Sequence, residues 1–217
     1  MNEETLAARA LVYRTLQSIT ADVPQRNNVA VALSDVFIDA LGRCGVRVDE
    51  VGFANEARAF DADGDTYTNN LISQYTRLFC GPGKLAAPPW ESSYMEAGRK
   101  IFQRNTLDVR ASYRTQGLRA HAVNKIPDDA LSIELGFMAE LAMRMCGSDE
   151  SAHEAYRASA NFLETHLGRW AETYARDVEA SHVGTFYPLL MTAMASFVQA
   201  DEKLLAHDDL LATPIQA

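Results

Sequence analysis

Cysteine is scarce in this sequence, and its spacing excludes two common structural supports. The 217 residues contain three cysteines, Cys44, Cys80 and Cys146, and no Cys-x-x-Cys pair. An odd number of widely separated cysteines indicates neither a disulfide framework nor a zinc site. Cys44 falls at the end of an expected helix and Cys146 on an expected helical stripe. We therefore expect both to be buried thiols in a reducing cytosol.

Long apolar runs are also lacking. No run approaches the roughly 18 residues that span a membrane. The first residues, Met1-Asn2-Glu3-Glu4, are acidic and lack the apolar segment of a signal peptide. We expect a cytoplasmic protein without stable membrane insertion.

Positive charge is in deficit. Lys and Arg number 20 against 29 Asp and Glu, which gives a formal net charge of -9. Nucleic-acid binding needs a basic face, so we expect no nucleic-acid partner. A basic peptide is compatible with this charge, although most acidic proteins bind nothing basic.

No segment shows a convincing β pattern, and apolar residues recur instead at helical spacing. Asn2 and the acids after it predict a helix start, and Pro24 follows its end. Gly81-Pro82-Gly83 predicts a helix stop. We expect an all-α, single-domain bundle of roughly eight to ten helices over residues 1–217, with a loop at 80–94 and a linker at 118–127. The expected helices span approximately residues 2–22, 27–41, 49–60, 66–79, 105–117, 127–146, 151–174 and 185–205.

Catalytic motifs are missing as well. Residues 81–84 resemble the end of a phosphate loop, but Leu78 replaces its first glycine and Leu85 its Ser/Thr. His207-Asp208-Asp209 leaves a helical metal-dependent hydrolase as an alternative from another class. Nothing in the sequence demands a catalyst, and we expect neither an enzyme nor a cofactor.

What the sequence does have is an unusual loop from Tyr75 to Tyr94. Pro88-Pro89 stiffens its exit, because the residue before a proline is held extended. Trp90 follows at once. From its residue type alone, Trp90 is as well explained by a place in the core as by presentation on a rigid loop.

Three blocks of this sequence together resemble the TorD/DmsD family of chaperones. The first is Tyr75-x-x-Leu78-Phe79-x-Gly81-Pro82-Gly83, continued by Ala87-Pro88-Pro89-Trp90-Glu91-Ser92-x-Tyr94. The second is Ile126-Pro127-Asp128-Asp129-Ala130, where the family pattern is Glu-Pro-Asp-Asp-His. The third is Phe162-Leu163-x-x-His166-Leu167-x-x-Trp170, followed by Phe186-Tyr187 and Phe197.

The resemblance implies a cytoplasmic chaperone for the apo catalytic subunit of a molybdopterin-containing oxidoreductase. It implies binding of that subunit, of its twin-arginine leader peptide, or of both, before the cofactor is inserted. An assembly chaperone of the nitrate-reductase type, for a cytoplasm-facing enzyme, is the alternative within the same class. The chaperone itself would be a monomer or a dimer.

A receptor for two arginines needs carboxylates beside an apolar groove, because guanidinium pairs bidentately with carboxylate. Asp128 and Asp129 are adjacent acids at an expected helix start, although acids there are also common caps. Ile126 and Ala130 depart from the family block, so one carboxylate and one titratable group are missing. The predicted peptide-binding residues are Trp90, Glu91, Tyr94, Pro127, Asp128, Asp129, Leu131, Glu134 and Phe137.

Overall fold

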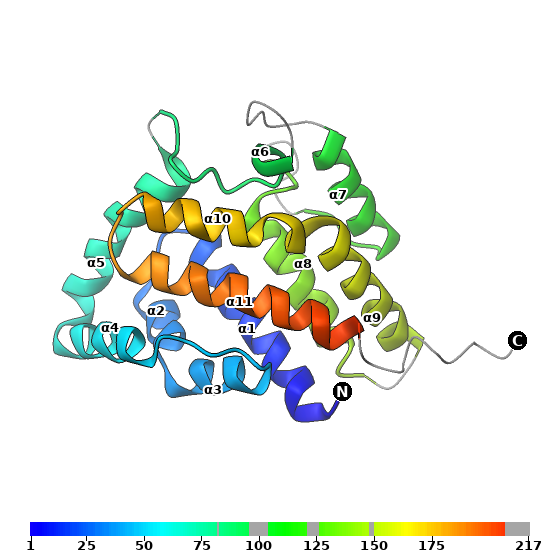
Figure 1. Cartoon of the computed structure of the whole chain (residues 1–217), viewed down its shortest axis with the longest axis horizontal. Helices are drawn as coiled ribbons and strands as arrows, with labels where there is room; N and C mark the ends of the chain where they lie inside the picture. Colours follow the sequence, from blue (N-terminus) through cyan, green and yellow to red (C-terminus); the bar gives the residue numbers. More distant parts are fainter. Residues whose placement is uncertain (82, 96–103, 121–125, 148–149, 207–217) are drawn as a thin grey trace, which may run out of the picture.

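Helices make up the regular structure of the part of the chain that the computed structural model describes, which is residues 1–81, 83–95, 104–120, 126–147 and 150–206. These ranges contain no β-strand, so the expected all-α bundle is confirmed (Figure 1). The helices are α1 (Glu3–Ala21), α2 (Arg26–Ala32), α3 (Asp35–Arg43), α4 (Glu50–Ala62), α5 (Gly64–Tyr75), α6 (Ser92–Met95), α7 (Arg104–Thr115), α8 (Leu131–Arg144), α9 (Glu150–Phe162), α10 (Gly168–Ala180) and α11 (Phe186–Ala206). Two π-helical turns, Thr76–Cys80 and Leu163–Leu167, continue α5 and join α9 to α10.

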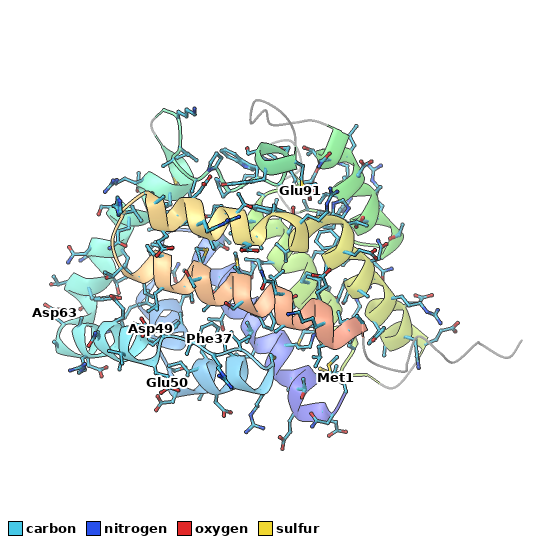
Figure 2. The ribbon with its side chains drawn as sticks, in the orientation of Figure 1. Met1, Phe37, Asp49, Glu50, Asp63 and Glu91 are labelled. Atoms are coloured by element: carbon cyan, nitrogen blue, oxygen red, sulfur yellow. The ribbon has the colours of Figure 1, made fainter. Side chains whose placement is uncertain are left out.

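Short polar side chains start several of these helices. Asn2 Oδ1 accepts a hydrogen bond from the Thr5 amide at 2.8 Å, which confirms the expected cap of α1. Asp49 and Asp63 cap α4 and α5 in the same way, and Figure 2 shows these two residues at opposite ends of α4. Gly81, with φ of 81°, ends the π-helical turn after α5, as its residue type predicts.

The bundle is built around α1 and α8. These two helices pack against each other, α3 lies on α1 and α9 lies on α8. Helices α10 and α11 form an antiparallel pair across them, with α4 and α5 at one end of the molecule and α6 and α7 at the other (Figure 1). Their apolar faces share one core, in which Tyr13, Trp170 and Phe197 are fully buried.

A buried ion pair joins the first helix to the last. Arg9 on α1 pairs with Asp201 on α11 through Nε and, at 2.9 Å, through Nη2, and neither side chain is exposed. Tyr13 donates a hydrogen bond to the same carboxylate at 2.7 Å. Asp201 therefore has bidentate and hydroxyl partners, which a buried charge requires.

The prediction of one continuous helix over residues 27–41 is wrong, because the structure has two helices there, α2 and α3. The chain turns at Leu33, and Ser34 caps a new helix by accepting from the Phe37 amide at 3.3 Å. The break changes which side chains face the core. An apolar stripe at helical spacing would place Val36 inward with Phe37 and Leu41, but Val36 is 66% exposed while Phe37 and Leu41 are buried.

Two further expectations need correction around α8. The helix begins at Leu131 and not at Pro127, because Ala130 is held extended (φ -74°, ψ 138°) by a backbone bridge to Trp90. The helix also ends at Arg144, so Cys146 lies in the turn beyond it and is exposed, whereas Cys44 is buried as expected. The linker predicted at 118–127 falls partly outside the described residues.

Candidate peptide-binding site

A short antiparallel bridge brings the first two sequence blocks together. The Glu91 amide donates to the Asp129 carbonyl at 3.0 Å, and the Leu131 amide donates to the Pro89 carbonyl at 2.9 Å. The two prolines before Trp90 hold the loop extended, which suits it to this pairing. The bridge therefore places the aromatic loop directly over the start of α8.

Four carboxylic acids gather beneath this bridge, and we call them the acid cluster: Glu91, Asp128, Asp129 and Glu134. Their exposed fractions are 1%, 2%, 0% and 0%. Figure 2 shows Glu91 beside the short helix α6. Acids are rarely buried to this extent unless they are paired, so the partners of each define the site.

Asp129 is used for local structure. Its Oδ2 accepts from the Ser92 amide, the first residue of α6, at 2.9 Å. Its Oδ1 accepts from the Thr106 hydroxyl of α7 at 3.0 Å. Asp129 thus holds α6 and α7 to the loop and is not a cap of α8.

Asp128 pairs with a cation that the sequence reading missed. Arg110 of α7 places Nε and Nη2 each 2.5 Å from Asp128 Oδ2. The Arg110 side chain is 28% exposed, while that of Asp128 is 2% exposed. Tyr113 fixes the backbone there, since its hydroxyl donates to the Asp128 carbonyl at 2.9 Å.

Glu91 faces a histidine from the other side of the cluster. His166 Nδ1 lies 3.2 and 3.1 Å from the two carboxylate oxygens, and Asn105 Nδ2 donates to Oε1 at 3.2 Å. His166 belongs to the π-helical turn Leu163–Leu167. The wider turn directs this ring at the cluster, and π-helical insertions are often found at functional sites.

Glu134 is the deepest member. Trp170 Nε1 donates to its Oε2 at 3.1 Å, while Oε1 has no hydrogen-bond partner among the described residues. Burial, and after it the charge of Glu91, raises the pKa of the Glu134 carboxyl well above its ordinary value. A proton is therefore held more tightly at Glu134 than on a carboxyl in water.

The predicted apolar residues divide into two groups. Trp90 and Tyr94 are partly exposed, and Tyr94 stacks on Trp170 with ring centroids 5.4 Å apart. Leu131 and Phe137 are 1% and 6% exposed and belong to the core, like Pro127, which is also buried. Phe137 packs against Tyr113 and Phe162 and supports the cluster from below.

The structure thus brings all nine predicted residues to one place, the junction of the loop with α7, α8 and α10. Seven of the nine are buried among the described residues, and Trp90 and Tyr94 are partly exposed. The sequence reading missed Arg110, Thr106, Asn105 and Tyr113, because no motif marks α7. His166 and Trp170 were visible in the third block but were given no role. A cavity of about 480 Å³ lies elsewhere, between α4 and the α10–α11 turn.

Other kinds of site find little support in the described part of the chain. Among those residues no group of three or more His, Cys, Asp or Glu side chains could hold a metal ion. His207-Asp208-Asp209 lies outside the described ranges. None of the described helices has both the length and the apolar character needed to cross a membrane.

Comparison with known proteins identifies the family. Residues 49–176 match the family described as nitrate reductase delta subunit, a stretch that contains the whole acid cluster, Arg110, His166 and Trp170. The chain belongs to this family. The resemblance seen in the three sequence blocks is confirmed, because relatives carrying the names TorD and DmsD are also found.

Three of these relatives show the range of similarity. The chaperone protein TorD of Psychrobacter sp. (strain PRwf-1) is 26% identical over 136 residues, which is 62% of each chain. The Tat proofreading chaperone DmsD of Salmonella typhimurium is 30% identical over 122 residues, 56% of this chain and 55% of that one. The probable Tat proofreading chaperone DmsD of Haemophilus influenzae is 26% identical over 121 residues, with the same coverage. The chain thus spans a little over half the length of these relatives.

Proposed function

We propose that this protein is a maturation chaperone for a molybdopterin-containing oxidoreductase. It binds the apo catalytic subunit, the twin-arginine leader of that subunit, or both, in the cytoplasm, until the cofactor is inserted. It acts as one chaperone domain over residues 1–217, as a monomer or a dimer, and performs no chemistry itself. The proposal is supported by family membership and by relatives whose names are chaperone protein TorD and Tat proofreading chaperone DmsD.

The observation that carries the proposal is the acid cluster under an aromatic loop. Four buried acids face one arginine and one histidine among the described residues, which leaves an excess of negative charge. Guanidinium groups are the cations best matched to carboxylates in such a setting. Trp90 and Tyr94, both partly exposed, offer apolar contacts beside it for the segment that follows the arginines.

Within this proposal the predicted site residues take different parts. Trp90 and Tyr94 contact the apolar segment of the leader. Asp128 receives an arginine, since its present partner Arg110 reaches solvent. The buried residues hold this surface in place and tune its charge, and these are Glu91, Pro127, Asp129, Leu131, Glu134 and Phe137.

Titration calorimetry with a synthetic twin-arginine leader tests the proposal. We expect the wild type to bind it, and to bind a twin-lysine version more weakly, because lysine lacks the planar fork. Asp128→Asn removes one charge at constant shape and should weaken binding by about 1–3 kcal/mol. Asp35→Asn on the exposed start of α3 is the matched control, with the same charge change far from the loop. Equal affinity of both variants would remove Asp128 from recognition.

A nitrate-reductase-type assembly chaperone is the second candidate, and the description of the matched family favours it. Such a chaperone binds the body of a cytoplasm-facing client. Binding of an apo catalytic subunit that lacks its leader, together with no binding of the isolated leader, would select this alternative.

A further inference from the structure

Arg110 has a position in the acid cluster that no other described residue shares. Among the described residues it is the one permanently charged cation that pairs with an acid of the cluster. Its Nε and Nη2 both lie 2.5 Å from Asp128 Oδ2. Both N–H groups of this guanidinium reach one carboxylate oxygen, and a bound arginine could pair with the same carboxylate.

The exposure of the two partners differs in a way that matters for access. The Asp128 side chain is 2% exposed and the Arg110 side chain 28%. Of the two paired groups, the guanidinium side is therefore the more accessible to solvent. Tyr113 fixes the backbone of Asp128 by donating to its carbonyl, while Arg110 comes from α7 and its side chain is partly exposed.

The interior side of the cluster has acceptor capacity left over. Glu134 is fully buried, and its Oε1 has no hydrogen-bond partner among the described residues. An unsatisfied buried oxygen is unfavourable unless a donor reaches it. The excess of acids over basic groups among the described residues favours the entry of further N–H donors.

We propose that Arg110 is an internal competitor for the leader, occupying the place on Asp128 that an arginine of the peptide takes. This rests on the proposed function. On binding, the peptide guanidinium replaces that of Arg110, whose side chain turns out to solvent. No bond is made or broken, and one guanidinium–carboxylate pair replaces another. Lysine exchanges poorly, because its point charge does not reproduce the fork.

The exchange lowers the apparent affinity by the fraction of time that Asp128 is free. When a binding-competent state has a population of about one tenth, the measured Kd is about tenfold weaker than the intrinsic one. Removing Arg110 should therefore strengthen leader binding by about tenfold. A residue that merely supports the fold would weaken binding when removed.

Two measurements on one set of variants test this. The first is the melting temperature of Arg110→Ala with and without methylguanidinium at low millimolar concentration, which refills the vacated place. Arg144→Ala is the matched control, because the Arg144 side chain is 30% exposed and its partner Glu140 is 42% exposed. We expect methylguanidinium to stabilise Arg110→Ala more than the wild type or Arg144→Ala. Arg110→Ala with Asp128→Asn should lose this gain.

The second measurement is calorimetry with the twin-arginine and twin-lysine leaders. We expect Arg110→Ala to bind the twin-arginine leader about tenfold more tightly than the wild type, with a smaller gain for twin-lysine. Arg110→Lys keeps a positive charge at this position, and its affinity for the twin-arginine leader should lie between those of the wild type and Arg110→Ala.

The outcomes separate two kinds of failure. Unchanged or weaker leader binding by both Arg110 variants would overturn the competitor role, as would equal methylguanidinium effects on Arg110→Ala and Arg144→Ala. No leader binding by any variant would overturn leader recognition within the proposed function, and the exchange with it. If no variant bound the leader but methylguanidinium still stabilised Arg110→Ala selectively, Asp128 would bind a guanidinium group and the leader would be the wrong ligand.

Discussion

At the scale of single residues, Glu134 is the acid whose environment is least like water. It is fully buried on α8, accepts one hydrogen bond from Trp170, and faces Glu91, Asp129 and Tyr113. Its raised pKa means that the folded state binds a proton there more tightly than the unfolded state does. The associated stability is complete below the unfolded value, near 4.5, and is lost as pH rises toward the folded value.

Replacing this acid should consequently stabilise the protein at neutral and basic pH. Glu134→Gln keeps an acceptor for Trp170 and places amide donors beside Glu91. We expect it to match the wild type near pH 5 and to exceed it by about 1–3 kcal/mol at pH 8, the size of an unsatisfied buried polar group. Urea unfolding at several pH values measures the difference.

Glu140→Gln, on the same helix with a 42% exposed side chain, should show no such slope. If the wild type gained stability over Glu134→Gln as pH rose, Glu134 would have to be a charge that the fold favours.

The same scale shows what residue types could and could not reveal. Their pattern grouped Trp90, Glu91 and Asp128, and the structure places these three residues at one junction. The pattern left Asp128 open between a helix cap and an arginine ligand, and the structure gives it an arginine of its own chain, Arg110. The partner of Asp128 comes from α7, which is distant in sequence, so the residue types alone could not show this pairing.

At the scale of elements, the π-helical turn Leu163–Leu167 sets where His166 points. Gly168 follows it with an ordinary helical φ of -64°, yet a Cβ there would lie 2.4 Å from the Leu163 carbonyl oxygen. The extra residue in the turn brings that carbonyl close. The glycine is thus required by space and not by its backbone angles.

We therefore expect Gly168→Ala to destabilise the protein, against the usual rule. Alanine normally stabilises a helix interior by about 1 kcal/mol relative to glycine. Gly136→Ala in α8 is the control, because its nearest neighbour is Gln17 Cγ at an ordinary 3.5 Å. The two variants should shift the melting temperature in opposite directions. Stabilisation by both would show that the turn relaxes to a regular helix without penalty.

The start of α1 followed from the sequence because a cap, Asn2, marked it. Predicted boundaries failed where a tertiary contact intervened. Ser34 caps a helix in the middle of an apolar pattern that was continuous in the sequence. The start of α8 is delayed by a backbone bridge to a loop some forty positions away.

At the scale of the whole molecule, Arg9 and Asp201 connect the two ends of the described chain through its core. Removing one partner of a buried pair leaves an isolated charge and costs about 3–5 kcal/mol. We expect Asp201→Asn to lose that much in urea unfolding. Arg9→Met with Asp201→Leu should recover most of the loss, since well-packed apolar residues often replace such pairs at little cost.

Asp65→Asn provides the comparison on the surface. The substitution breaks the pair with Arg26, in which the side chains of Arg26 and Asp65 are 56% and 76% exposed. We expect it to cost less than about 1 kcal/mol of stability. Similar losses in the free energy of unfolding for Asp65→Asn and Asp201→Asn would mean that the buried pair contributes no more to stability than the surface pair.

The bridge between Trp90 and Ala130 has an evolutionary consequence. It is made by main-chain atoms of Pro89, Glu91, Asp129 and Leu131, so it is indifferent to the side chains at positions 90 and 130. Lineages can therefore vary the groups displayed there without dismantling the scaffold that displays them. Ala130 stands where the family block has histidine, and the loop is nevertheless in place. A site built this way can change its displayed groups by substitution alone, while the fold stays the same.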